Sequence, residues 1–138
     1  MKQSFLERFK IIGLPVFQLE VMGHEYLFVA DSGSQYNVIS TDLFKELALE
    51  QESVESLDLF GIDGKTETMP FYFLRYSIDG EEFDEKFAVA SEDTFTQVNL
   101  SGIQIDGLIG STFMIKHNFI IDYNQCVLYT AENEVSSK

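Results

Sequence analysis

The residues best suited to do chemistry form one short segment, Asp31-Ser32-Gly33-Ser34. An apolar stretch, Leu27–Ala30, runs directly into it, as expected when a β-strand enters a protein core. The strand would deliver a carboxylate to a tight turn, where a hydroxyl follows the acid and Gly33 allows a ligand or a second backbone to approach closely. Asp-Ser-Gly is also a common turn in which the aspartate only caps the backbone. The segment alone is compatible with a catalytic acid and with a structural turn.

A second segment, Leu108-Ile109-Gly110, comes much later in the chain and leads into a predicted short helix, Ser111–His117. Together the two segments resemble the retropepsin-like aspartic proteases, the family of retroviral proteases and their bacterial relatives. In that family an Asp-Thr/Ser-Gly-Ala/Ser motif follows an apolar strand. A later strand of two apolar residues and a glycine threads beside this motif and leads into a helix. The order of elements is similar over residues 14–130.

The resemblance implies a role for each matching residue. Asp31 would be the catalytic acid, and a glycine-rich hairpin between the two segments would close over the substrate as a flap. The residues with supporting roles would be Ser32, Gly33 and Ser34 in the catalytic loop, Gly61, Ile62, Asp63 and Gly64 in the flap, and Leu108, Ile109 and Gly110 in the strand that braces the loop.

The chemistry that the resemblance implies needs two carboxylates about 3 Å apart that share one proton. The ionised carboxylate takes a proton from a bound water, which attacks the peptide carbonyl, while the protonated carboxyl donates a hydrogen bond to the carbonyl oxygen. The sequence has a single motif of this kind, so a second Asp31 would have to come from a second chain. The resemblance therefore implies a homodimer that cleaves a peptide or protein substrate, with no metal ion and no other cofactor.

Three positions depart from the family pattern. Retroviral members carry an acidic residue just after the catalytic turn and pair it with an arginine after the later glycine, but here those places hold Gln35 and Ser111. Bacterial and cellular relatives often have an aspartate where this chain has Thr112. Two other functions therefore stay open: a catalytically weak or inactive peptide-binding module on the same fold, and an unrelated small β-barrel that binds an apolar ligand.

Short strands separated by turns dominate the remaining sequence. Hairpin turns are predicted at Gly23, Asp63-Gly64, Asp79-Gly80 and Asn124-Gln125. The strands that flank Asp63-Gly64 are expected at 57–62 and 65–73, and those that flank Asp79-Gly80 at 71–78 and 83–90. Cys126 is expected in the last strand as a small buried side chain. This pattern predicts a mostly β fold, a closed β-barrel of the retropepsin-like type with one or two short helices.

A single domain accounts for most of the chain. Residues 1–13 are expected to form an arm or a short helix, 14–130 the domain, and 131–138 a flexible tail. A further helix is predicted over 42–50, because Ser40 or Thr41 can serve as its N-cap.

Composition excludes several classes of partner. The chain of 138 residues has 9 Lys and Arg against 23 Asp and Glu, a formal net charge of −14, which argues against nucleic acid and against an anionic membrane surface. The only cysteine, Cys126, cannot form an internal disulfide, and His24 and His117 lie too far apart in sequence to suggest a metal site. We expect a cytoplasmic protein, and a signal peptide removed from before Met1 stays an alternative.

Overall fold

The computed structural model describes residues 1–48, 55–60, 66–90 and 102–130. The strands are β1 (Lys2–Ser4), β2 (Val16–Val21), β3 (His24–Ala30), β4 (Asn37–Ile39), β5 (Glu55–Phe60), β6 (Thr66–Ile78), β7 (Glu81–Val89), β8 (Gly107–Ile109), β9 (Phe119–Asp122) and β10 (Val127–Thr130). The helices are α1 (Leu6–Ile12), α2 (Thr41–Leu47) and α4 (Ser111–Lys116).

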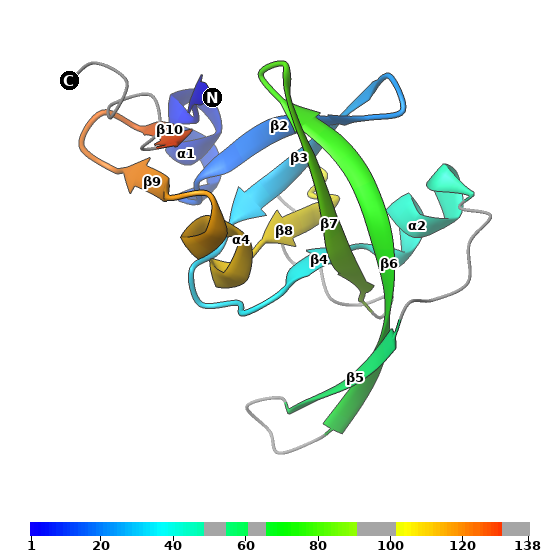
Figure 1. Ribbon diagram of the computed structural model, residues 1–138. Helices are drawn as coiled ribbons and strands as arrows, with labels where there is room; N and C mark the ends of the chain where they lie inside the picture. The colour runs from blue at the N-terminus through cyan, green and yellow to red at the C-terminus, as the bar shows by residue number, and fades with distance from the viewer. Residues whose placement is uncertain (49–54, 61–65, 91–101, 131–138) are drawn as a thin grey trace.

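Six strands close into a barrel, which positions everything else (Figure 1). Their order is β2-β3-β8-β4-β7-β6, and β6 pairs back with β2 where Ser77 lies opposite Glu20. β5 is added on the outer side of β6. The predicted mostly β, closed-barrel fold is therefore confirmed.

Three of the hairpins form at the turns that the sequence predicts, because Asn124-Gln125 also lies in the turn that joins β9 to β10. Met22 and Gly23 join β2 to β3 with φ values of 52° and 83°, and Asp79 and Gly80 join β6 to β7 with φ values of 53° and 84°. Positive φ at both central residues is the geometry that matches the right-handed twist of paired strands, and glycine adopts it without strain.

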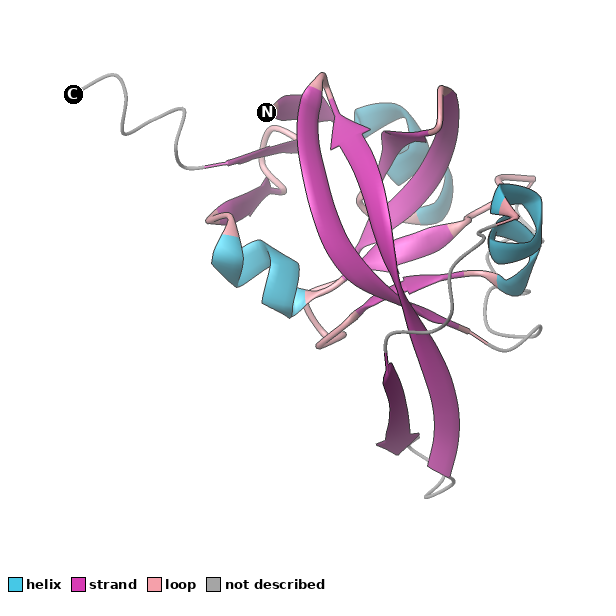
Figure 2. Cartoon of the chain, turned by 45° about the vertical axis from the view of Figure 1, so that its right-hand side comes forward, coloured by secondary structure: helices cyan, strands magenta, loops and turns pink. Residues whose placement is uncertain are grey.

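The strand β6 differs from the prediction, because it is one continuous strand of 13 residues rather than two. Its first half pairs with β5, with Phe60 opposite Thr66, and its second half pairs with β7. One long strand thus serves two hairpins, which local sequence patterns cannot distinguish from two shorter strands. The hairpin of β5 and early β6 projects from the body of the barrel (Figures 1 and 2), and its predicted turn at Asp63-Gly64 lies outside the described residues.

A second, three-stranded sheet joins the two ends of the described chain in the order β1-β10-β9. Strand β1 was not predicted, because its partner β10 lies at the other end of the sequence. The Gln3 side chain ties this sheet to the barrel, since it accepts a hydrogen bond from the Gln18 backbone N–H and donates one to the Gln18 carbonyl. Cys126 is buried as expected, but it lies in the turn before β10 with a φ of 54° rather than in the strand. The expected tail, 131–138, lies outside the described residues.

The barrel wall separates two apolar clusters, because side chains alternate along each strand. The larger cluster is built around aromatic rings, with Tyr76 packed against Phe83, Phe87 and Phe113 at centroid distances of 5.3–6.1 Å. The smaller cluster lies on the other face of the same strands. Six of its residues form one row of register partners across the strands: Val16, Val29, Leu108, Val38, Ala88 and Phe71.

Candidate active site

The structure brings together the two segments that the sequence singled out. Strand β8 lies between β3 and β4, parallel to β3 and antiparallel to β4. The Asp31 backbone N–H continues the β3 ladder by donating to the Ile109 carbonyl at 2.9 Å. The turn that starts at Asp31 therefore begins where β8 ends, next to Gly110.

Within one chain the Asp31 carboxylate takes part in the turn itself. Its Oδ1 accepts a hydrogen bond from the Gly33 N–H at 3.0 Å, and the Asp31 carbonyl accepts one from the Ser34 N–H at 3.1 Å. A Cβ on residue 33 would lie 3.2 Å from that same Oδ1, so glycine keeps the space beside the acid open. Asp31 is only half-buried, while Ser32 and Gly33 are exposed. The turn-capping bond, which is the alternative structural role for Asp31, is thus present, and it leaves the carboxylate partly accessible from outside the chain.

The loop that follows Asp31 is held by the first turn of α4. The Ser111 N–H donates to the Ser34 carbonyl at 2.6 Å, and the Thr112 N–H donates to the Gln35 carbonyl at 3.2 Å. The Thr112 hydroxyl donates to the same Gln35 carbonyl at 2.6 Å. Two of the three residues where this chain departs from the family pattern, Gln35 and Thr112, therefore contact each other through backbone and hydroxyl groups, while Ser111 bonds to Ser34.

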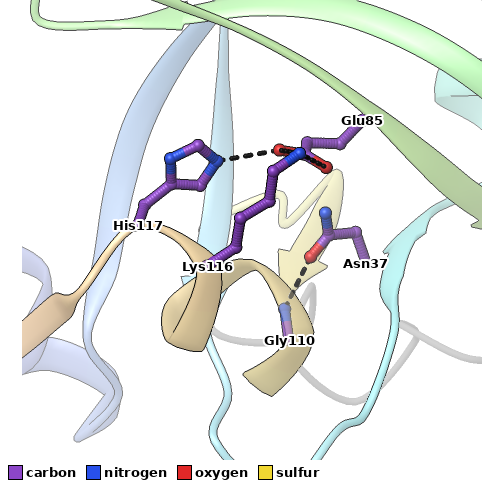
Figure 3. A network of polar contacts seen from close by, with 5 residues as sticks. All are labelled: Asn37, Glu85, Gly110, Lys116 and His117. Atoms are coloured by element: carbon purple, nitrogen blue, oxygen red, sulfur yellow. Dashed lines mark hydrogen bonds and ion pairs between the residues drawn. The ribbon is translucent and has the colours of Figure 1, made fainter.

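A buried asparagine, which the sequence reasoning missed, locks β4 to the end of β8. Asn37 is 5% exposed, and its Oδ1 accepts a hydrogen bond from the Gly110 N–H at 2.8 Å (Figure 3). A Cβ on residue 110 would meet the carbonyl oxygens of Tyr36 and Ser34 at 2.5 and 2.6 Å, so only glycine fits there. A single polar residue inside the apolar run 36–39 was the signal that could have revealed Asn37.

The other end of α4 is anchored to the barrel. The Glu85 carboxylate on β7 contacts His117 Nε2 at 2.8 Å and Lys116 Nζ at 3.3 Å (Figure 3). The His117 ring also packs against Phe113 and Phe83, with centroid distances of 4.6 and 4.9 Å. His117 therefore joins the end of α4 to β7 through a polar contact and through ring packing.

An apolar, partly exposed surface includes residues near the end of β3, the strand that leads to Asp31. Val29 precedes Asp31 by two residues and packs with Leu108 and Leu14 against the smaller cluster. Pro15 fixes this surface to the end of β3, because its carbonyl accepts a hydrogen bond from the Ala30 N–H at 3.0 Å.

The four residues of the predicted flap, Gly61, Ile62, Asp63 and Gly64, lie outside the described residues. Within the part of the chain that is described, no three His, Cys, Asp or Glu side chains converge as metal ligands. None of the helices in the same part is long and apolar enough to cross a membrane.

Comparisons with known proteins agree with this arrangement. The sequence model of the family described as aspartyl protease matches residues 17–113, from β2 to α4. No curated protein matches the sequence. The chain is similar in structure to the retroviral protease-like domain of Ddi1 from Leishmania major, with a TM-score of 0.61 and 13% identity over 85% of this chain and 87% of that one. The family match covers well over half of the sequence and the fold agrees, so the chain belongs to the retropepsin-like aspartic protease family.

Proposed function

We propose that the protein hydrolyses peptide bonds as a homodimer in which each chain contributes one Asp31. The observation that carries this proposal is the half-buried Asp31 carboxylate, which sits at the end of a core strand in a loop fixed by β8 and α4. Membership of an aspartyl protease family supports protease-type chemistry. One such loop per chain supplies only half of a carboxylate pair, so a two-fold dimer is the simplest complete site.

The paired carboxylates would work by sharing one proton. Two like charges about 3 Å apart cannot both ionise, so one carboxyl stays protonated while the other is ionised. The ionised group removes a proton from a water held between them, and this water attacks the peptide carbonyl. The protonated group donates a hydrogen bond to the carbonyl oxygen, where negative charge develops. Cleavage should therefore be fastest at acid pH, where one proton is retained by the pair.

The surroundings of Asp31 favour an extended peptide with apolar side chains. Partly exposed apolar area comes from Val29, two residues before Asp31 in sequence, and from Leu108 and Leu14, which pack against the same cluster. Burying such area against a substrate side chain stabilises the complex by roughly 25 cal/mol per Å². The projecting hairpin of β5 and β6 would cover the bound peptide.

The replacement Asp31→Asn tests this function. Cleavage of an unfolded protein substrate at acid pH should fall by at least about a thousandfold, because a carboxamide can neither hold nor release the shared proton. Asp122→Asn is the matched control, since Asp122 Oδ1 likewise accepts a hydrogen bond from a backbone N–H two residues later, at 2.9 Å. The control should retain full activity.

Comparing the wild type with Asp31→Asn also distinguishes the protease from a peptide-binding module. If the wild type and Asp31→Asn bind a peptide equally and neither cleaves it, the protein is a peptide-binding module rather than a protease. Unchanged cleavage by Asp31→Asn would exclude Asp31 as the catalyst.

A further inference from the structure

The first turn of α4 lacks a capping side chain of its own. Its N-cap is Gly110, which makes no side-chain hydrogen bond to the helix. The first N–H groups of a helix have no partner inside the helix and must find one elsewhere. Here the N–H groups of Ser111 and Thr112 donate to the carbonyls of Ser34 and Gln35. The catalytic loop therefore takes the place of the missing cap.

Thr112 adds a bond that the backbone alone would not supply. Its hydroxyl and its N–H both donate to the Gln35 carbonyl, at 2.6 and 3.2 Å. Gln35 is four residues beyond Asp31, and the intervening Ser34 carbonyl is held by Ser111 at 2.6 Å. The Thr112 side chain is exposed, so it contributes little to the packing of the core. Its main effect falls on the position of the loop.

We propose that Thr112 is a positioning residue that fixes the catalytic loop within one chain, through its paired bonds to the Gln35 carbonyl. This inference rests on the proposed function for its catalytic consequence. Thr112 acts through the loop and does not itself touch the substrate. A displacement of the reacting group by about 1 Å can cost about a hundredfold in rate, so one lost bond at this place should be visible in kcat.

Thr112→Val tests the proposal, because valine keeps the size of threonine but cannot donate a hydrogen bond. We expect kcat to fall by about tenfold while KM stays within about twofold, since the apolar binding surface is untouched. Thr112→Ser restores the hydroxyl and should recover at least about half of the wild-type kcat.

Thr41→Val is the matched control. The Thr41 hydroxyl also donates to a backbone carbonyl, that of Ala90 at 2.5 Å, but it lies at the start of α2 and not in the loop. This variant should keep the wild-type kcat even if it unfolds at a lower temperature. Equal kcat in Thr112→Val and the wild type would overturn the proposal, and so would an equal loss of kcat in Thr41→Val.

Amide hydrogen exchange gives a readout that does not depend on cleavage. Thr112→Val should speed exchange of the Gly33 and Ser34 N–H groups by about tenfold relative to Thr41→Val, because both N–H groups bond to Asp31 within the loop. If the wild type cleaves no substrate but Thr112→Val still speeds amide exchange, the proposed protease function is wrong and the positioning role of Thr112 is supported. If the wild type is active but Thr112→Val changes neither amide exchange nor kcat, the positioning role of Thr112 is wrong and the proposed protease function is supported.

Discussion

A buried carboxylate, Asp106, lies one residue before β8 and links it to β3. Asp106 is 7% exposed, and its Oδ2 accepts a hydrogen bond from the Leu27 N–H at 3.2 Å while its Oδ1 accepts one from Gln104 Nε2 at 3.2 Å. Burial raises the pKa of Asp106, and these two hydrogen bonds only partly oppose the rise. The charged form is therefore less favourable in the folded chain than in the unfolded chain.

The raised pKa of Asp106 makes the stability of the folded chain depend on pH in a known direction. A carboxyl whose pKa is higher in the folded state favours folding at a pH below its unfolded pKa, and this contribution is lost as the pH rises through the folded pKa. We expect Asp106→Asn to gain stability relative to the wild type as the pH is raised from about 4 to 7. Urea unfolding at several pH values measures the difference between the two free energies of unfolding.

Asp79→Asn is the control for the Asp106 experiment. Asp79 is exposed in the turn between β6 and β7, and asparagine tolerates its positive φ of 53°. This variant reports the general effect of removing one negative charge from a chain of net charge −14. If the free energies of unfolding of the two variants depend on pH in the same way, burial of Asp106 does not perturb its titration.

Among the elements, α4 holds the loop that follows Asp31 at one end and contacts the barrel at the other. Its far end is fixed by His117, which combines the 2.8 Å contact to Glu85 with ring packing on Phe113 and Phe83. The Lys116 contact to the same carboxylate is longer, at 3.3 Å, and the Lys116 side chain is 59% exposed. Exposed ion pairs contribute little because water screens them.

We therefore expect His117→Ala to cost about 1–3 kcal/mol of unfolding free energy, since both a partly buried hydrogen bond and ring packing are lost. Lys116→Ala should cost at most about 0.5 kcal/mol. Chemical denaturation of the two variants side by side measures this difference. An equal or larger loss in Lys116→Ala would mean that the anchor of α4 is wrongly assigned.

Gly110, the single residue between β8 and α4, should not tolerate a side chain. In Gly110→Ala the new methyl group would meet the carbonyl oxygens of Tyr36 and Ser34 at 2.5 and 2.6 Å, so the backbone of the catalytic loop must shift. We expect a loss of about 1–3 kcal/mol in stability and of at least about a hundredfold in cleavage rate. Ser111→Ala is the control, because residue 111 contacts the loop through its backbone N–H and should keep its activity.

The sequence was most informative where one local pattern determines one element. The turns at Gly23 and Asp79-Gly80 and the Ser40 cap of α2 form as predicted, because each depends on a few neighbouring residues. Strand β1 was missed because it depends on pairing with β10, at the other end of the chain. The continuous β6 and the position of Cys126 likewise depend on contacts that local patterns do not encode.

At the site, residue types were easier to predict than their partners. The family resemblance implies that Asp31 lies close to Ile109 and Gly110, and in the structure the Asp31 N–H bonds to the Ile109 carbonyl. The buried hydrogen bond of Asn37 was not predicted, because it joins residues 73 positions apart in sequence. Gln35 and Thr112 differ from the family pattern, but the sequence does not show that these two residues bond to each other.

For the whole molecule, charge opposes the dimer that the proposed function requires. Each chain carries a net charge of −14, so two chains repel each other at neutral pH. Salt screens this repulsion, and protonation of carboxylates reduces it as the pH falls toward the isoelectric point near 4.3. Association and catalysis should therefore be favoured under the same acid conditions.

We expect the dissociation constant of the dimer to fall as salt is raised from about 0.05 to 0.5 M at neutral pH, and again as the pH is lowered to about 5. Sedimentation equilibrium at several protein concentrations measures it directly. A strictly monomeric chain under all of these conditions would leave Asp31 without a partner.

Mixing wild-type and Asp31→Asn chains tests most directly whether one Asp31 from each of two chains makes the active site. At a fixed total concentration, with free exchange of subunits, an equal mixture should retain about one quarter of the wild-type cleavage rate, because only dimers of two wild-type chains are active. A rate of about one half would mean that each wild-type chain acts independently of its partner, and would contradict the shared carboxylate pair.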